Sequence, residues 1–223
     1  MPSRRWDSAN LRIGILGGTF NPVHYGHLWI AQVVMEKVSL DSVVFMPSGQ
    51  PPLKSRDLAS PIQRMHMVRL AIASNPRFCA SDIEFSGEGK SYTVFTISDL
   101  KRKYPSDELF YILGSDAFID MPNWKEPGSI INSVNLVVVM RPGISDDAVK
   151  SSPFAENLVY DADDPEMALL QLKGGRQAVV IAGTSLDISS SQIRERIKKR
   201  LSVKYLLPPD VEEYILANNI YNC

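Results

Sequence analysis

Short apolar runs recur along the chain and are separated by longer amphipathic stretches. Each run is apolar at successive rather than alternate positions, which is typical of strands that are buried on both faces of a parallel sheet. The pattern predicts strands at residues 12–16, 42–46, 109–113, 135–140 and 178–181, with a further short strand within residues 77–84.

Apolar positions at helical spacing fill many of the stretches between these runs. In residues 24–38, for example, Leu28, Ala31, Val34 and Val38 fall on one helix face. Helices are likewise predicted at residues 61–74, 92–103, 190–201 and 210–217. Strands that alternate with helices indicate an α/β fold, namely a doubly wound, Rossmann-like parallel sheet with helices on both faces and a small C-terminal helical part at about 188–223.

The length of 223 residues suits a single large domain. Residues 1–10 are mainly polar, and we expect them to form a loose N-terminal arm. Residues 11–223 are then expected to form one α/β domain. Residues 145–175 show no clear periodicity, so no element is predicted there.

Charge and hydropathy exclude several functional classes. The chain has 24 basic and 25 acidic residues, whereas a dedicated nucleic-acid binder usually carries a strongly basic face. No apolar run approaches the roughly 18 residues of a membrane span, and residues 13–16 are too short for a signal peptide. We therefore expect a cytoplasmic protein that binds neither nucleic acid nor membrane. The helix faces at 190–217 can pack internally or between chains, which leaves a homo-oligomer open.

Residues 12–28 carry the strongest chemical signal. An apolar strand ends at Gly17 and Gly18, the chain turns, and a helix begins near His24. At such a junction, backbone N–H groups and the positive helix end face a ligand, which is where α/β proteins bind phosphates. The spacing matches neither the Gly-x-Gly-x-x-Gly dinucleotide motif nor a P-loop. The alternative interpretation is a tight turn that binds nothing.

Two histidines, His24 and His27, lie three residues apart at this helix start and share one helix face. Imidazoles there can donate hydrogen bonds to phosphate oxygens and stabilise charge that develops in a transition state. The alternatives are two surface histidines, one capping and one packed histidine, or a metal site. No His-Glu-x-x-His pattern or nearby carboxylate pair supports a metal site. We therefore expect no metal ligand among the protein side chains.

A second polar cluster lies at residues 187–196, Asp-Ile-Ser-Ser-Ser-Gln-Ile-Arg-Glu-Arg. A serine at a helix start is most simply an N-cap, and we expect at least one of these serines to have that role. The remaining hydroxyls, the free N–H groups and Arg194 together make a second anion site. Two anion sites at one edge of a sheet suit a polyphosphate better than a monophosphate.

Three further residues are candidates that also have an ordinary interpretation. Lys54 can reach a phosphate or can be a simple exposed lysine. Trp124 can stack on a flat ring or can cover the core. Asp116 follows a predicted strand at the edge where ligands bind, and its alternative role is a helix N-cap.

These motifs resemble those of a known superfamily. Residues 17–27, Gly-Gly-Thr-Phe-Asn-Pro-Val-His-Tyr-Gly-His, look like the N-terminal signature of nucleotidyltransferases with a (His/Thr)-x-Gly-His motif. Residues 188–194 look like their Ile-Ser-Ser-Thr-x-Ile-Arg motif. Within this superfamily the chain resembles the bacterial nicotinate-mononucleotide adenylyltransferases over about residues 12–221. Further agreement comes from the Pro-Pro-x-Lys loop at 51–54, Ser91-Tyr92-Thr93, Gly114-x-Asp116, Trp124 and Arg141-Pro142-Gly143.

The resemblance implies transfer of the adenylyl group of ATP to nicotinate mononucleotide, with Mg²⁺ carried by ATP. The products are nicotinate adenine dinucleotide and pyrophosphate, formed in NAD biosynthesis by in-line attack without a covalent intermediate. The resemblance gives His24 and His27 catalytic roles. Implied ATP contacts are Gly17, Gly18, Thr19, Phe20, Gly26, Lys54, Gly114, Asp116, Ser190, Ser191 and Arg194, and implied mononucleotide contacts are Thr93, Trp124 and Lys125.

Four positions depart from the family pattern. Asn21 and Phe95 each stand where an Asp is common, Leu53 replaces a common His, and Ser191 replaces Thr but keeps the hydroxyl. Two alternative functions are another transferase of this superfamily, acting on nicotinamide mononucleotide or phosphopantetheine, and a non-catalytic nucleotide-binding regulator. The choice between nicotinate and nicotinamide mononucleotide depends on a few donors that the sequence does not place.

Overall fold

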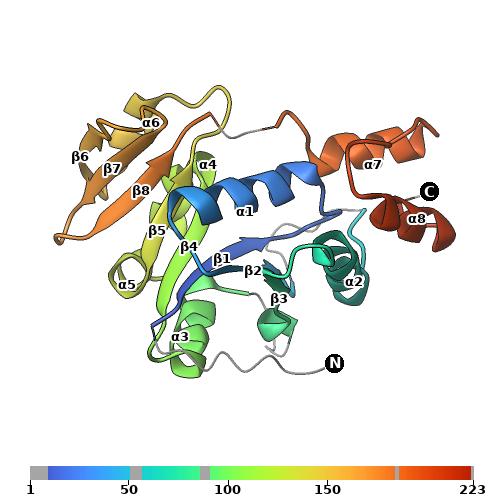
Figure 1. The fold of residues 1–223 in the computed structure, drawn as a ribbon, viewed down its shortest axis with the longest axis horizontal. Helices are drawn as coiled ribbons and strands as arrows, with labels where there is room; N and C mark the ends of the chain where they lie inside the picture. The colour runs from blue at the N-terminus through green and yellow to red at the C-terminus, as the bar shows by residue number, and fades with distance from the viewer. Residues whose placement is uncertain (1–9, 51–56, 86–90, 184–185, 222–223) are drawn as a thin grey trace.

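An eight-stranded sheet runs through the computed structural model, which describes residues 10–50, 57–85, 91–183 and 186–221 (Figure 1). The strands lie in the order β3-β2-β1-β4-β5-β8-β7-β6. Their bounds are β1 (Arg12–Gly18), β2 (Ser42–Pro47), β3 (Phe78–Ala80), β4 (Glu108–Gly114), β5 (Asn135–Val139), β6 (Ala155–Tyr160), β7 (Met167–Leu172) and β8 (Gln177–Ile181). All six strands predicted from the apolar runs are confirmed.

The middle of the sheet is parallel, and the strand order reverses direction at β1. β1 pairs in parallel with β2 on one side and with β4 on the other. The pairs β2–β3, β4–β5 and β5–β8 are parallel as well. In open α/β sheets, ligands bind outside the carboxyl ends of the strands at such a reversal. The fold therefore places the glycine turn after β1 at the expected ligand site, beside the end of β4.

The far edge of the sheet contains a hairpin that the sequence pattern did not predict. Residues 145–175 form the short helix α6 (Asp146–Lys150) followed by β6 and β7. β7 runs antiparallel to β8, and β6 runs antiparallel to β7, so the sheet is mostly rather than wholly parallel. β7 alternates between buried Leu170 and the 41% exposed Leu169. One face of this hairpin is thus open to solvent, which removes the continuous apolar run.

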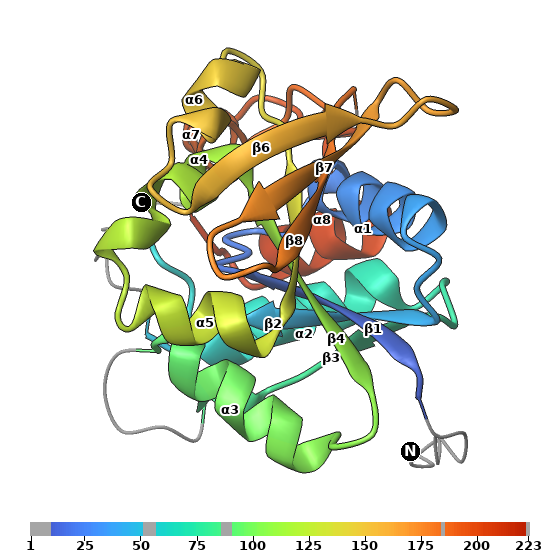
Figure 2. The same ribbon diagram turned by 90° about the vertical axis from the view of Figure 1, so that its left-hand side faces the viewer.

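Helices cover both faces of the sheet, as predicted (Figure 2). One apolar cluster contains buried residues of α1 (Tyr25–Lys37), α2 (Pro61–Ile72), α7 (Ser190–Lys198) and α8 (Pro209–Ala217). The other contains buried residues of α3 (Thr93–Lys103), α4 (Ser115–Asp120), α5 (Pro127–Ser133) and α6. Two short 3-10 helices, η1 (Ile83–Phe85) and η2 (Met121–Asn123), complete the elements.

The C-terminal helices join the core of the same chain. Ile193 and Ile197 of α7 and Val211 and Ile215 of α8 are buried in the cluster that includes α1 and α2. These faces of the segment 190–217 therefore pack internally. Burial of such aliphatic side chains stabilises the fold by about 1.5–3 kcal/mol each.

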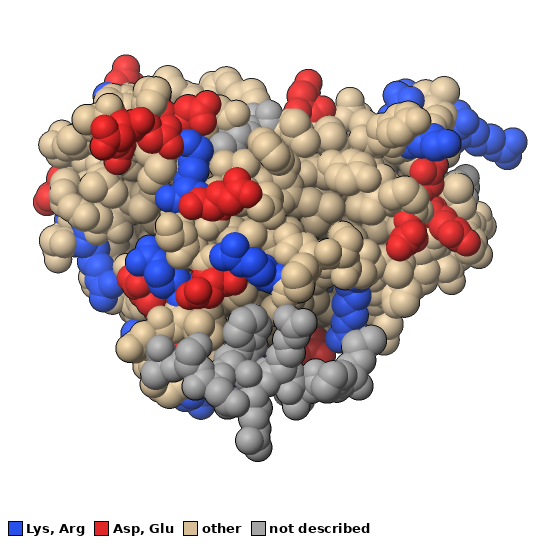
Figure 3. All heavy atoms as spheres, in the orientation of Figure 1, with Lys and Arg blue, Asp and Glu red and all other residues tan. Residues whose placement is uncertain are grey.

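Charged side chains of both signs are interspersed on the face shown in Figure 3. On the hairpin side, Lys37 at the end of α1 pairs with Asp164 and, at 3.2 Å, with Glu166.

No helix within the described part of the chain is long and apolar enough to span a membrane. The predicted N-terminal arm falls almost entirely on residues 1–9, which lie outside the described residues.

Candidate active site

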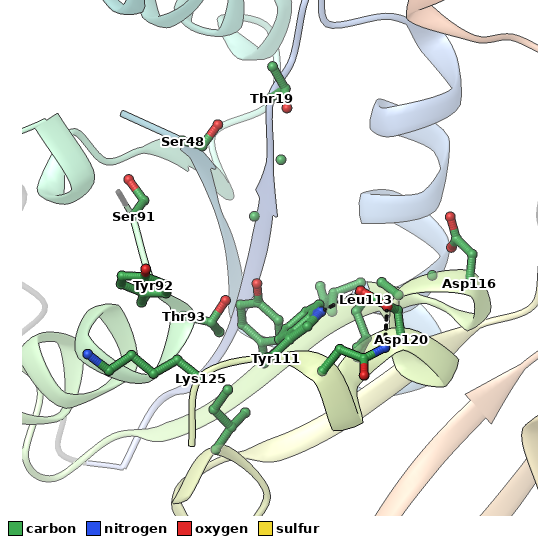
Figure 4. A pocket seen from close by; sticks show the side chains of 18 of the residues that line it. Thr19, Ser48, Ser91, Tyr92, Thr93, Tyr111, Leu113, Asp116, Asp120 and Lys125 are labelled. Carbon is green, nitrogen blue, oxygen red and sulfur yellow. Dashed lines mark hydrogen bonds between the residues drawn. The ribbon is translucent and has the colours of Figure 1, made fainter. Parts of the chain in front are cut away.

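A cavity of about 530 Å³ opens where β1 and β4 end (Figure 4). The glycine turn after β1 contributes one wall, and the start of α4 contributes another. The predicted site residues that line this cavity are Gly17, Gly18, Thr19, Thr93, Gly114, Asp116, Trp124 and Lys125. The structure thus brings together residues from four separate segments that the sequence analysis had connected only through motifs.

The two histidines form a stacked pair at the start of α1, where His24 is the N-cap. Their ring centres are 3.8 Å apart and their planes are inclined by 33°. The backbone N–H of His24 donates to Nδ1 of His27 at 3.3 Å. Nδ1 of a neutral His27 is therefore the acceptor, so its proton is on Nε2, where it can be donated to a ligand.

Both histidines are neutral at neutral pH. Burial lowers the pKa of His24 to about 4, and the charge of Arg141 lowers it in the same direction. Burial also lowers the pKa of His27 well below its ordinary value, with smaller contributions from His24 and Arg141. A bound polyphosphate would act in the opposite direction, because negative charge nearby favours the protonated imidazole.

The glycine between the histidines has a steric role. A Cβ at Gly26 would lie 3.0 Å from both Cε1 and Nδ1 of His24, so a larger residue there would force the His24 ring to shift by a few tenths of an ångström. The His27 ring is held from another side by Phe20, whose ring meets it edge to face at 4.9 Å. Phe20 itself is only 1% exposed. It therefore supports the histidine ring from the core.

The second polar cluster lies directly against the glycine turn. The Ser190 hydroxyl donates to the carbonyl of Pro22 at 2.8 Å. Arg194 donates from Nη1 to the carbonyl of Asn21 at 2.8 Å and from Nη2 to the Ser191 hydroxyl at 3.1 Å. The structure therefore unites the two clusters at one end of the sheet.

The predicted helix cap in this cluster is confirmed. The backbone N–H of Gln192 donates to the Ser189 hydroxyl at 3.1 Å, so Ser189 caps α7. The capping serine is thus distinct from Ser190 and Ser191, which contact the glycine turn and Arg194.

Asn21, one of the departures from the family pattern, is buried, and its side chain makes three hydrogen bonds. Its Nδ2 donates to the carbonyl of Asp57 at 2.8 Å. Its Oδ1 accepts from the backbone N–H of Ala59 at 3.0 Å and from the Tyr221 hydroxyl at 2.7 Å. An aspartate could accept the last two bonds but could not donate the first. The amide therefore suits this chain.

Arg64 was not among the predicted site residues, yet it joins three segments around the site. It is fully buried in α2. Its guanidinium donates to the carbonyls of Thr19 at 2.8 Å, Ser48 at 2.7 Å, Gly49 at 3.1 Å and Ala59 at 3.1 Å. These bonds fix the glycine turn relative to the segments on either side of residues 50–58.

Trp124 is fixed by its edge at the other end of the cavity. Its indole N–H donates to Oδ2 of Asp120 at 3.1 Å, and Asn123 donates to Oδ1 of the same carboxylate at 2.9 Å. Thr93 hydrogen-bonds the buried Tyr111, and burial raises the pKa of Tyr111 to about 12. Figure 4 shows Thr93 and Tyr111 side by side. The N–H edge of the Trp124 indole is thus hydrogen-bonded to Asp120, and Trp124 also forms part of the cavity wall.

Asp116 is not the helix N-cap that the alternative interpretation proposed. Gly114 is the N-cap of α4, and Asp116 lies in the first turn. Its Oδ1 accepts from Nε of Arg141 at 2.9 Å. A Cβ at Gly114 would lie 2.3 Å from that oxygen and 2.7 Å from the arginine Nε, so glycine makes room for the pair.

Arg141 lines the cavity but was not predicted as a site residue. A signal for it existed, because it follows the apolar run of β5 as Asp116 follows that of β4.

Lys54 and Leu53 fall within residues 51–56, which lie outside the described residues. Among the described residues, no group of three or more His, Cys, Asp or Glu side chains is arranged to hold a metal ion.

Comparison with known proteins places this chain in a family. The family model described as cytidylyltransferase-like matches residues 15–196. A protein of Geotalea daltonii named probable nicotinate-nucleotide adenylyltransferase is 46% identical over 217 residues, which cover 95% of this chain and 99% of the relative. A protein of Dictyoglomus thermophilum with the same name is 43% identical over 214 residues, covering 95% and 100%.

Solved structures show the same fold. A Plasmodium falciparum nicotinic acid mononucleotide adenylyltransferase complexed with NaAD aligns with a TM-score of 0.70 at 21% identity, over 95% of this chain and 98% of that chain. Its complex with APC aligns with a TM-score of 0.71 at 18% identity over the same shares. The chain belongs to the cytidylyltransferase-like nucleotidyltransferases and, within them, to the nicotinate-nucleotide adenylyltransferase family. The resemblance based on residues 17–27 and 188–194 is confirmed.

Proposed function

We propose that this protein transfers the adenylyl group of ATP to nicotinate mononucleotide, releasing pyrophosphate and forming nicotinate adenine dinucleotide. The observation that carries the proposal is the contact of two anion-binding motifs beside one cavity. Ser190 and Arg194 bond the carbonyls of Pro22 and Asn21, next to the histidine pair. Family membership supports the choice of reaction.

In this proposal, the triphosphate of ATP lies between the glycine turn, the histidines and the start of α7. His24 and His27 contact the phosphate that is attacked, and Arg194 contacts the far phosphates. The start of α7 adds the Ser190 and Ser191 hydroxyls and backbone N–H groups at the positive helix end. Further ATP contacts are proposed for Gly17, Gly18, Thr19, Phe20, Gly26, Lys54, Gly114 and Asp116.

The mononucleotide is proposed to occupy the cavity beyond the glycine turn. Trp124 is suited to stack on the pyridine ring, because its edge is already held by Asp120. Thr93 and Lys125 line the same cavity, and we assign them to the ring end of the substrate.

The reaction needs orientation and charge stabilisation rather than a protein nucleophile. An oxygen of the mononucleotide 5′-phosphate forms a bond to the α-phosphorus of ATP as the bond to the bridging oxygen of the β-phosphate breaks. The electron pair of the broken bond leaves with pyrophosphate. The Nε2–H of His27 donates to the oxygens on which charge accumulates, and such a preorganised donor acts without reorganisation.

Mg²⁺ is proposed to enter as part of the nucleotide substrate, on the triphosphate oxygens. Mg²⁺ keeps most of its water ligands and needs few protein ligands when substrate phosphates hold it. The donors around the triphosphate path fit this, because Arg194 and the serine hydroxyls bind phosphate oxygens directly rather than enclosing a cation. The bound ion would neutralise part of the triphosphate charge.

The test is the release of pyrophosphate from ATP with each of three acceptors: nicotinate mononucleotide, nicotinamide mononucleotide and phosphopantetheine. We expect nicotinate mononucleotide to have the highest kcat/KM. Preference for another acceptor would assign a different transferase of the superfamily. Absence of pyrophosphate with all three would favour a nucleotide-binding regulator.

A further inference from the structure

A lysine side chain lies against two aromatic rings at the cavity. The Lys125 ammonium is 4.5 Å from the centre of the Phe95 ring and 5.0 Å from the centre of the Tyr92 ring. These two rings meet edge to face, 6.1 Å apart. Figure 4 shows the Lys125 side chain extended towards Tyr92. An aromatic face attracts an ammonium group, so the two rings restrain where this charge lies.

The charge of Lys125 has no acidic partner in the described part of the chain. Within the described residues, no carboxylate forms an ion pair with Lys125, whereas Arg141, the other cation on the cavity wall, is paired with Asp116 at 2.9 Å. A carboxylate beside Lys125 would hold it and cancel its charge. Aromatic rings hold it and leave the charge in place. Phe95, which stands where the family commonly has Asp, therefore leaves this charge without a carboxylate partner on that side.

The acids of the cavity wall are engaged with other partners. Asp120 accepts from the Trp124 indole at 3.1 Å. Glu84 accepts from the Thr96 hydroxyl at 3.0 Å, and burial raises the pKa of this carboxyl group. Among the described residues that line the cavity, Lys125 is therefore the cation without a carboxylate partner that an acidic group on the pyridine ring could meet.

We propose that Lys125, oriented by Phe95 and Tyr92, makes this cavity prefer an acidic pyridine mononucleotide over the corresponding amide. The inference rests on the proposed function and concerns its selectivity. The two mononucleotides share the ribose and the phosphate, and they differ only in a carboxylate against a neutral amide. A cation at the ring end binds the carboxylate more strongly than the amide, whereas a cation at the phosphate binds both mononucleotides equally well.

The experiment compares kcat/KM for nicotinate and nicotinamide mononucleotide at saturating ATP. Lys125→Met keeps the length of the side chain and removes the charge. We expect it to lower kcat/KM for the acid about fivefold and for the amide less than about twofold, as for one exposed charge contact. Phe95→Asp supplies a partner for Lys125. It should lower the ratio of kcat/KM for the acid to kcat/KM for the amide severalfold. Phe95→Leu adds no charge and should lower the ratio less.

Two controls separate selectivity from general damage. Lys173→Met removes an exposed lysine in the turn between β7 and β8, at the opposite end of the sheet, and should leave the ratio unchanged. Raising the salt concentration should reduce the ratio of the wild type but not that of Lys125→Met, because an exposed charge is screened. Thermal unfolding midpoints confirm that each variant is folded.

An equal loss for both mononucleotides in Lys125→Met, or an unchanged ratio in Lys125→Met and Phe95→Asp, would overturn the inference and leave the proposed function standing. Absence of pyrophosphate release by the wild type with either mononucleotide would overturn the proposed function and the inference together.

Discussion

The two ends of the candidate site are built in different ways. At the histidine end, Arg194 and Ser190 are anchored to main-chain carbonyls of the glycine turn, and His24 is buried. At the other end, which we propose binds the pyridine ring and call the pyridine end, Lys125 is exposed, and Phe95 is 50% exposed. The contacts of Lys125 and Trp124 there join side chains to side chains.

In our proposal, this difference separates the residues of the chemical step from the residues that set substrate selectivity. Every residue type has the same main-chain carbonyl. The bonds that Arg194 and Ser190 make to such carbonyls therefore depend on the fold rather than on the identity of the partner residue. Side-chain contacts such as Lys125 on Phe95 can be changed by one substitution without disturbing the sheet. We therefore expect substitutions at the histidine end to reduce turnover and substitutions at the pyridine end to change substrate preference.

The largest effect is expected for His27→Ala. This change removes the Nε2–H donor, and losing one transition-state donor costs about 10²–10³ in kcat. Steady-state rates of pyrophosphate release measure it, and circular dichroism checks that the fold is retained. Unchanged turnover would show that His27 has no role in the reaction.

The next effect is expected for Gly26→Ala. The added Cβ would lie 3.0 Å from the His24 ring and would displace it. A small misplacement of a catalytic group can lower the rate about 10²-fold, and we expect kcat to fall by about ten- to a hundredfold. Gly128→Ala is the matched control, because no atom lies within 4 Å of a Cβ there. Equal rates for the two variants would contradict the steric role of Gly26.

A smaller effect, confined to one substrate, is expected for Trp124→Ala. Loss of the stacking surface should raise KM for the mononucleotide about tenfold, as for a stacking contact worth about 1–1.5 kcal/mol, and should leave KM for ATP nearly unchanged. Trp124→Phe keeps a ring and should recover most of the loss. A rise only in the KM for ATP would show that Trp124 contacts ATP rather than the mononucleotide.

The smallest effect is a dependence of stability on pH. The pKa of His24 is about 4 in the folded protein and 6.5 in the unfolded chain. Between these values the unfolded chain binds more protons, so the free energy of unfolding is highest above pH 6.5 and falls as the pH drops towards 4. The slope is about 1.4 kcal/mol per pH unit for one histidine.

Urea unfolding at pH 7 and pH 5 measures this slope. His24→Asn cannot titrate in this range and should lose less stability than the wild type, while the carboxylates titrate alike in both proteins. Parallel losses in the two proteins would mean that burial does not lower the pKa of His24 in this way.

The central strands were predictable because they are buried on both faces, which produces continuous apolar runs such as residues 135–140. The β6–β7 hairpin was not, because Leu169, Val159 and Tyr160 are exposed and the edge strand β6 lacks a buried run. A strand with one face in solvent resembles polar loop sequence when its residues are mixed.

The proximity of His24, His27 and Arg194 was predictable, because residue type and chain position together carry the signal. Arg64 was not, because an arginine on a surface helix is normally exposed. Its burial depends on the carbonyls of Thr19 and Ser48, which the fold brings to α2 from distant segments. Main-chain acceptors leave no trace in the identity of the residues that carry them.

The central claim is that the site presents the α-phosphorus of ATP directly to the phosphate of nicotinate mononucleotide. ATP labelled at the α-phosphorus tests it most directly. The label should appear in nicotinate adenine dinucleotide, with one pyrophosphate released for each dinucleotide formed. Label found in free AMP, or retained on the protein after the nucleotides are removed, would contradict direct transfer.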